Sequence, residues 1–377
     1  MIPPFPQVFL YKSKDTAAAD KKRLQTEILD TCFSEALAPL YEHLCAELGL
    51  PKDERKLAEM RAANEKQLAE LEAKAKDAEE NLGETEVRDA THARAEYLGR
   101  IGDREGAAKA YGETEEKTAS GGAKADMVFS QIRLQILYED WHAVKRLLAK
   151  AKGICEAGGD WEHKNKLKVY EAVFSMYTRD FKRAASLFLD SIATFTTSEL
   201  FDYTRCITYA VLTAAIALDR PDLKAKVVDS PEVLAVVGAV PHLAPFLHSL
   251  YECRYAEFYK AFAGLMDLVR ADMYLAPHLR WYMRETRLVA YGQFLESYKS
   301  VTLDSMAAAF DVSPAFLDQE LADFIVAGRL GAKIDKVSGV VESKRPDARN
   351  ARYQDVIRRG DLLLNRIQKL SRIIDIE

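Results

Sequence analysis

Residues 300–343, SVTLDSMAAAFDVSPAFLDQELADFIVAGRLGAKIDKVSGVVES, carry the local signals that decide the fold of the C-terminal part of the chain. A short strand is predicted at its start, and Thr302 is suited to cap a helix that runs to Phe310. Ser313 followed by Pro314 predicts a second helix, because Ser is a favoured N-cap and Pro a favoured first helical residue. The stretch therefore begins as strand, helix, turn and helix.

The second predicted helix ends near Gly328 and gathers five large side chains on one face: Phe316, Leu317, Leu321, Phe324 and Ile325. Two strands follow at 332–335 and 340–343, joined by a turn that contains Ser338 and Gly339. Helix, turn, helix and hairpin, in this order, predict a winged-helix domain over 300–347. We expect the strand at Val340 and Val341 to form an exposed edge that pairs with a strand of a partner protein.

Many winged helices place their second helix in the major groove of DNA. Here that helix carries three acidic residues before its first cation, Arg329, so a phosphate backbone would meet a negative face. The whole chain of 377 residues has 53 Lys and Arg against 58 Asp and Glu, a formal net charge of −5. Both observations argue against a nucleic-acid partner.

Four similar phrases lie upstream, each with an aspartate between two amphipathic segments and each about 40 residues from the next. The aspartates are Asp103, Asp140, Asp180 and Asp219. An Asp in this place marks the turn of a helical hairpin and can cap its second helix. The pattern predicts a right-handed solenoid of degenerate TPR-like helical hairpins over 84–299, and the protein is expected to be mainly α.

Residues 1–83 predict an N-terminal helical region with a long charged helix. Its mostly apolar stripe recurs every three or four positions, at Leu57, Met60, Asn64, Leu68, Leu71, Ala75, Ala78 and Leu82. The charged residues around this stripe are interpreted as a solvated helix face. The alternative interpretation is a partner-binding surface.

Residues 348–377 predict a final helix with a heptad seam, formed by Val356, Gly360, Leu363, Ile367, Leu370 and Ile374. We expect this helix to bundle with helices of other proteins, because a lone helix would leave the large side chains of the seam in water. Its many cations are interleaved with the seam, which favours a solvated flank of a bundled helix over a nucleic-acid tail.

Sequence patterns for catalysis are missing. The five cysteines and seven histidines show no metal-ligand spacing, and no phosphate-binding loop, dinucleotide fingerprint or nucleophile elbow is present. We therefore expect no enzyme activity, no catalytic residues, no cofactor and no metal. The odd, scattered cysteines suit a reducing cytosolic or nuclear compartment, and no signal peptide or membrane span is predicted.

Long stretches of the chain resemble PCI-domain non-ATPase subunits of the proteasome regulatory particle lid, the family paralogous to signalosome subunit one. They are residues 77–89 (DAEENLGETEVRD), 158–170 (GGDWEHKNKLKVY), 179–190 (RDFKRAASLFLD), 191–197, 199–200, 294–347 and 360–374 (GDLLLNRIQKLSRII). The resemblance implies a helical-repeat array that leads into a winged helix. It also implies a non-catalytic scaffold that supports lid assembly and ubiquitin-dependent protein degradation.

The same resemblance implies the partners. They are other PCI subunits and the deubiquitinase-bearing subunits of the lid, with the ATPase base as a further candidate contact, in the cytoplasm and nucleus. No nucleic acid and no membrane are expected among them. The alternative is a PCI scaffold subunit of the signalosome, and the ending over 362–374 favours the lid.

Overall fold

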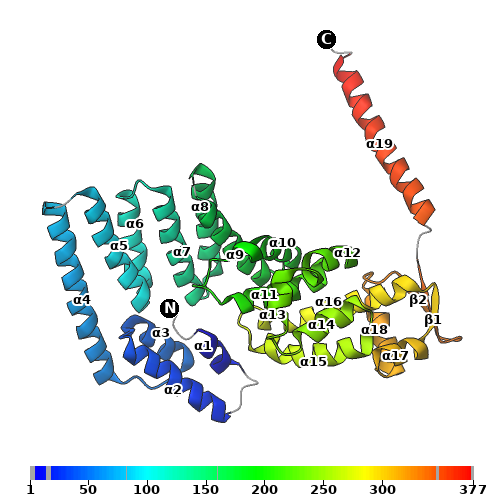
Figure 1. Ribbon diagram of the computed structural model, residues 1–377, viewed down its shortest axis with the longest axis horizontal. Coiled ribbons are helices and arrows are strands. Elements are labelled where there is room, and N and C mark those ends of the chain that lie inside the picture. The colour runs from blue at the N-terminus through cyan, green and yellow to red at the C-terminus, as the bar shows by residue number, and fades with distance from the viewer. Residues whose placement is uncertain (1–4, 14–17, 82, 159, 345–347, 375–377) are drawn as a thin grey trace. The chain divides into compact units, whose positions relative to one another are not determined.

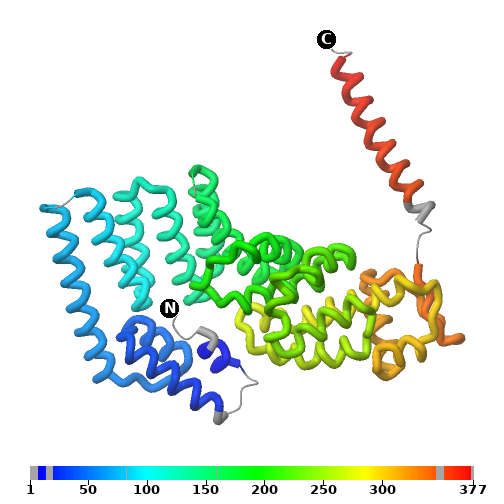
Figure 2. The backbone as a smooth tube through the Cα atoms, viewed as in Figure 1, coloured from blue at the N-terminus to red at the C-terminus, as the bar shows by residue number. Residues whose placement is uncertain are grey.

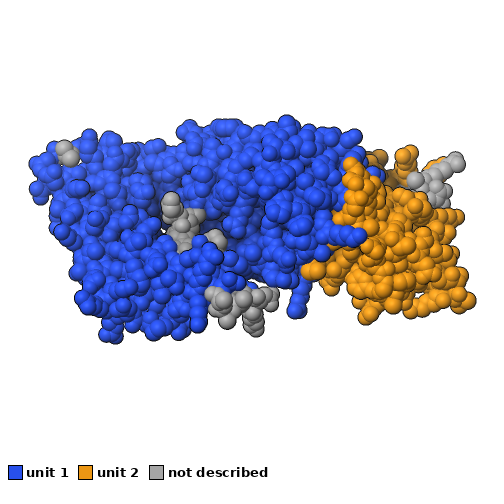
Figure 3. Space-filling view, turned by 60° about the horizontal axis from the view of Figure 1, so that its bottom comes forward, with its two compact units in different colours: residues 1–251, 260–282 blue, residues 252–259, 283–377 orange. Residues whose placement is uncertain are grey.

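The computed structural model describes residues 5–13, 18–81, 83–158, 160–344 and 348–374 (Figure 1). The chain forms two compact units, one of residues 1–251 and 260–282 and one of residues 252–259 and 283–377 (Figure 3). Helices α15 (Tyr255–Ala271) and α16 (Leu279–Ser297) contribute residues to both units.

Unit 1 begins with three helices, α1 (Phe5–Lys12), α2 (Ala18–Ser34) and α3 (Ala38–Leu48). They share a hydrophobic core with the start of the long helix α4 (Glu54–Asn81). Two buried residues of the predicted stripe, Leu57 and Met60, belong to this core. The stripe is buried or half-buried at the described positions, while Leu82 lies outside the described residues.

Successive helices of unit 1 then pack side by side as a two-layered array (Figures 1 and 2). The array comprises α5 (Glu84–Ile101), α6 (Arg104–Glu116), α7 (Gly121–Leu137), α8 (Trp141–Gly158), α9 (Trp161–Tyr177), α10 (Phe181–Ser191) and α11 (Tyr203–Ala217). Each helix contacts the next, and α7 also contacts α5 and α9. The predicted helical repeats are confirmed.

The aspartates of the repeated phrase cap three of the hairpins as predicted. Asp103 accepts a hydrogen bond from the backbone N–H of Gly106 at 3.0 Å, and Asp140 and Asp180 accept equivalent bonds at 3.0 and 3.2 Å. The fourth phrase differs, because Asp219 makes no such bond and α12 (Arg220–Leu223) continues as a single π-helical turn. Short helices α13 (Pro231–Val237) and α14 (Leu243–Tyr251) follow.

The N-terminal helices cover the hairpin turns of the first repeats. Gly102 has φ +83°, and a Cβ at this position would lie 2.9 Å from the Cβ of Leu40 on α3, so only glycine fits. Lys12 forms ion pairs with Glu47 at 2.7 Å and with Glu139, in the next turn, at 3.0 Å. Helices α1 and α3 therefore contact the turns on one side of the array.

Unit 2 contains the winged helix, whose element boundaries agree with the sequence signals. Its elements are β1 (Ser300–Thr302), α17 (Leu303–Phe310), α18 (Pro314–Val326), β2 (Ala332–Asp335) and β3 (Val340–Ser343). Thr302 and Ser313 each accept a hydrogen bond from a backbone N–H of the helix that they precede, at 3.3 Å. On the predicted apolar face of α18, Leu317, Leu321 and Phe324 are buried and Ile325 is half-buried. Phe316 is 46% exposed, so the prediction is wrong for this residue.

The sheet has the order β1-β3-β2, and both pairings are antiparallel. The last element is α19 (Ala348–Ile374). Within the described parts of the chain, no helix combines the length and apolar character needed to cross a membrane.

Candidate interaction surfaces

The predicted seam on α19 is exposed. Its large members, Val356, Leu363, Ile367, Leu370 and Ile374, are 53% to 66% exposed, and every other side chain described on this helix is also exposed. A Cβ at Gly360, the small member of the seam, would meet no neighbouring atom. An exposed apolar stripe of this length is uncommon on the surface of a soluble monomer, so α19 is a candidate interaction surface.

The exposed apolar face of α19 is wider than the seam that the sequence analysis identified. Ile357 and Leu364 each follow a seam residue directly, and both are more than half exposed. At 100° per residue they extend the stripe along one side of the seam. The sequence signal for these two residues is their heptad position, directly after a seam residue.

The predicted strand edge at Val340 and Val341 is wrong. β3 is the central strand, because its residues pair with β2 on one side and with β1 on the other. Val341 lies opposite both Val301 and Ile334 and is fully buried. A hairpin strand was expected to end the sheet, but β1, which precedes both helices in the sequence, pairs with it across the fold.

Among the described residues, the two edges of the sheet are β1 and β2. The N–H of Ser343 donates to the carbonyl of Lys299 at 3.0 Å, and the N–H of Leu303 donates to Gly339 at 2.8 Å. Hydrogen-bonded and non-hydrogen-bonded pairs alternate along an antiparallel ladder, so Ser300 directs its backbone groups away from β3. The bond from Lys344 N–H to Gly331 O, 2.7 Å long, gives Ile334 the same outward direction on β2.

The acidic second helix of the winged helix turns part of its charge inward. Glu320 on α18 pairs with Arg287 on α16 at 2.5 Å and accepts a hydrogen bond from the Tyr291 hydroxyl at 2.7 Å. Arg329, just after α18, donates two hydrogen bonds to the buried carboxylate of Glu285 at 3.0 and 2.5 Å. These bonds, which the sequence analysis missed, fix α18 on α16 and withdraw Glu320 from the surface.

The tip of the β2–β3 hairpin is held by Asp335. Its carboxylate accepts hydrogen bonds from the hydroxyl of Ser338 at 2.6 Å and from the backbone N–H of Val337 at 2.9 Å. These bonds lower the pKa of Asp335 below its usual range. The bonded turn leaves Val337 fully exposed at its end, which adds an apolar contact point beside the β2 edge.

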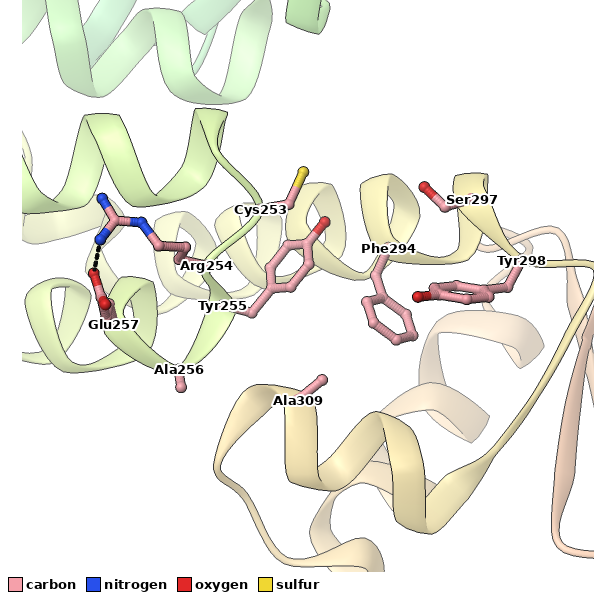
Figure 4. Close-up of a pocket in the computed structure, with 9 residues that line it drawn as sticks. All are labelled: Cys253, Arg254, Tyr255, Ala256, Glu257, Phe294, Ser297, Tyr298 and Ala309. Atoms are coloured by element: carbon pink, nitrogen blue, oxygen red, sulfur yellow. Dashed lines mark ion pairs between the residues drawn. The ribbon is translucent and has the colours of Figure 1, made fainter.

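A hollow of about 420 Å³ lies within unit 2 (Figure 4). Its walls are mostly apolar and aromatic: Cys253, Tyr255, Ala256, Phe294, Tyr298 and Ala309, with Ser297 and the ion-paired residues Arg254 and Glu257. Arg254 pairs with Glu252 at 2.6 Å and with Glu257 at 2.7 Å. The charged groups here neutralise one another, so this hollow has the character of an apolar groove.

Two buried titratable groups of unit 1, Asp272 and His278, belong to hydrogen-bond networks. Asp272 accepts hydrogen bonds from the Tyr209 hydroxyl at 2.5 Å and from the backbone N–H groups of Tyr274 and Leu275. His278 accepts a hydrogen bond from Arg179 at Nδ1, 2.9 Å, and its Nε2 lies 2.7 Å from the carbonyl of Tyr177. In the part of the chain that the structure describes, no group of three His, Cys, Asp or Glu residues could hold a metal ion.

Three family models match the chain. The model described as 26S proteasome subunit RPN7 matches residues 53–226, and the model of the PCI domain matches residues 265–345. The model described as 26S proteasome regulatory subunit RPN7/PSMD6 C-terminal helix matches residues 352–374, which lie within α19.

Curated relatives match over nearly the whole chain. The 26S proteasome non-ATPase regulatory subunit 6 homolog of Arabidopsis thaliana is 55% identical over 370 residues, 98% of this chain and 96% of its own length. The 26S proteasome regulatory subunit RPN7 of Saccharomyces cerevisiae is 36% identical over 391 aligned positions, 96% of this chain and 90% of its own length. The chain therefore belongs to the RPN7/PSMD6 family of PCI-domain regulatory subunits of the 26S proteasome.

Proposed function

We propose that the chain is a non-catalytic scaffold subunit of the lid of the proteasome regulatory particle, where it supports lid assembly and ubiquitin-dependent protein degradation. The observation that carries this proposal is the exposed apolar face of α19. The names of the relatives, non-ATPase regulatory subunits of the 26S proteasome, support the lid over the signalosome alternative.

The exposed seam can supply enough binding energy to hold a subunit in a complex. Full burial of a large aliphatic side chain contributes roughly 1.5–3 kcal/mol. Leu363, Ile367, Leu370 and Ile374 are a little more than half exposed. Covering them would contribute about 3–7 kcal/mol before the cost of ordering is subtracted.

The winged helix provides a second attachment. We propose that an edge of its sheet, β1 or β2, pairs with a strand of another PCI subunit, because edge strands present backbone donors and acceptors for such pairing. The remaining partners are the deubiquitinase-bearing subunits and the ATPase base, in the cytoplasm and nucleus. The lack of nucleophile, phosphate-loop and metal-ligand spacing in the sequence supports a role without catalysis.

A double substitution in the seam tests this function. Leu363→Asp with Ile367→Asp puts two charges into the face that we expect to be buried, where an unpaired charge is unfavourable by several kcal/mol. The matched control, Gln354→Asp with Asn365→Asp, adds the same charge on the opposite side of the helix. Each variant is mixed with the other lid subunits, and incorporation is measured by native gel electrophoresis.

We expect the control to enter the lid and the seam variant to remain free, with both chains equally helical by circular dichroism. Normal incorporation of the seam variant would contradict the proposal. Turnover of a ubiquitin conjugate by the purified chain, lost on substitution of one of its own residues, would contradict the non-catalytic role.

A further inference from the structure

Three arginines form a row along one flank of the α19 seam. Arg352, Arg359 and Arg366 are seven residues apart, and each directly precedes a seam-side heptad position, at Tyr353, Gly360 and Ile367. All three guanidinium side chains are exposed. The opposite flank has Ile357, Leu364 and Ser371 at the same spacing. Over residues 352–371 the apolar face therefore has one cationic border and one mostly apolar border.

The row is specific to one side of the helix. The remaining cations of the described helix surface, Arg358, Lys369 and Arg372, lie on the side away from the seam. Within the helix, Arg359 contacts Asp355 at 2.9 Å, and both side chains are mostly exposed. An exposed ion pair four residues apart is weak, so it leaves this arginine available to a stronger partner.

Flank positions of this kind select the partner of a helix through charge. In packed helices, the residues that border the apolar seam face the corresponding border of the neighbouring helix. Arginine presents a planar fork of donors that binds a carboxylate in two places, which makes it suited to a recurrent contact with Asp or Glu. A row of three arginines therefore specifies a neighbour with acidic residues at the same spacing.

A second copy of this chain does not fit the row. In an antiparallel pair of α19 helices the arginine borders would face each other, and like charges would repel. In a parallel pair each arginine row would face Ile357, Leu364 and Ser371, which offer no carboxylate. A second copy of α19 therefore lacks the carboxylates that would pair with the arginine row.

We propose that α19 packs against an apolar helix of another lid subunit whose border carries Asp or Glu side chains about seven residues apart, facing Arg352, Arg359 and Arg366. This inference rests on the proposed scaffold function and names the chemistry of the partner at the same surface. The arginine row determines which helix of the assembly lies on that side of α19, while the apolar seam supplies most of the contact area.

Charge reversal in the full-length chain tests the row. The triple variant Arg352→Glu, Arg359→Glu and Arg366→Glu is titrated into lid lacking this subunit, and its apparent affinity is compared with that of the wild type. The matched control, Arg358→Glu, Lys369→Glu and Arg372→Glu, changes the net charge equally on the outer side. We expect the row variant to bind about tenfold or more weakly, and the control to bind within about twofold of the wild type.

A charge-neutral variant and a conservative one sharpen the test. Replacing the three arginines of the row by Gln should flatten the salt dependence of incorporation, because ionic contacts weaken as ionic strength rises. Replacing them by Lys should restore most of that dependence. Circular dichroism checks that all variants keep the helix.

Cross-linking identifies the facing helix. A photoreactive amino acid at position 359 in assembled lid should capture a helix that carries acidic residues at heptad spacing. Equal loss of binding by the row variant and its control would overturn the proposal, as would a captured helix without such acids. If the row variant assembles normally but no longer binds heparin, the row binds a polyanion and not a helix of the lid, and the proposal is overturned. Failure of the Leu363 and Ile367 variant to disturb assembly would instead overturn the scaffold function itself.

Discussion

Helices α11 and α19 have opposite relations to the rest of the chain. Ten consecutive residues of α11, from Cys206 to Ala215, are buried, so this helix is surrounded by its own chain on every side. On α19 every described side chain is exposed, including the aliphatic seam. An apolar residue of α11 therefore stabilises the monomer, whereas one of α19 has its effect only when another chain covers it.

The largest effect should follow from the same substitution made in both helices. Leu212 on α11 is fully buried, and Leu212→Ala should lower the free energy of unfolding by about 2–5 kcal/mol, because it removes buried atoms and leaves a cavity. Leu370→Ala on α19 should change the unfolding free energy of the isolated chain by less than about 0.5 kcal/mol. Denaturant titration followed by circular dichroism measures both.

For assembly into the lid, Leu370→Ala should have the larger effect of the two substitutions. Leu370→Ala should weaken incorporation into the lid, because part of the covered seam is lost. Leu212→Ala should leave incorporation unchanged at temperatures where the variant is still folded. Equal destabilisation of the isolated chain by the two variants would break the comparison.

The winged helix repeats this contrast within one sheet and should show an intermediate effect. Val341→Pro in the central strand removes a backbone donor of the ladder. It should destabilise the winged helix by about 1–3 kcal/mol, the cost of leaving a buried acceptor unpaired. Ser300→Pro on β1 and Ile334→Pro on β2 each remove only a donor that points outward. We expect one of these two edge variants to weaken incorporation while the sheet remains folded.

Alanine at positions 300 and 334 provides the matched controls, since it keeps the backbone N–H. Incorporation is measured by native gels, and folding of the winged helix is followed by hydrogen exchange. If each proline variant is incorporated into the lid to the same extent as its alanine control, neither edge pairs with a partner strand.

The smallest expected effect concerns His278, a buried side chain of unit 1. Burial, with the nearby Arg179 cation adding to it, lowers the pKa of His278. Arg179 donates to Nδ1, so the neutral ring carries its proton on Nε2 and donates it to the carbonyl of Tyr177. Protonation would remove the acceptor and place two cations side by side.

The lowered pKa of His278 makes the folded chain less stable at low pH. Because the pKa is lower in the folded chain, the unfolded chain binds the proton more readily, and stability falls as the pH drops through about 6.5 and below. His278→Gln should reduce this part of the pH dependence, whereas the same change at the exposed His142 should not. Thermal denaturation at a series of pH values tests it, and identical profiles for wild type and H278Q would exclude the mechanism.

Local signals in the sequence predicted much of this structure. The helix caps could be identified without knowledge of the fold, because each capping side chain accepts a hydrogen bond from a backbone N–H three residues later. This holds for Thr302, Ser313 and the aspartates at 103, 140 and 180. The seam of α19 was equally accessible, since a helix fixes which residues share a face.

Only the tertiary structure decided the contacts between segments that are distant in the sequence. The sequence placed all three strands but not their order, because β1 is separated from the β2–β3 hairpin by two helices, and nothing local tells it which hairpin strand to join. The exposure of Phe316, the pairing of Glu320 with Arg287 and the fit of Leu40 against Gly102 have the same cause. Caps and helix faces depend on neighbours along the chain, whereas strand order and buried ion pairs depend on how whole elements pack.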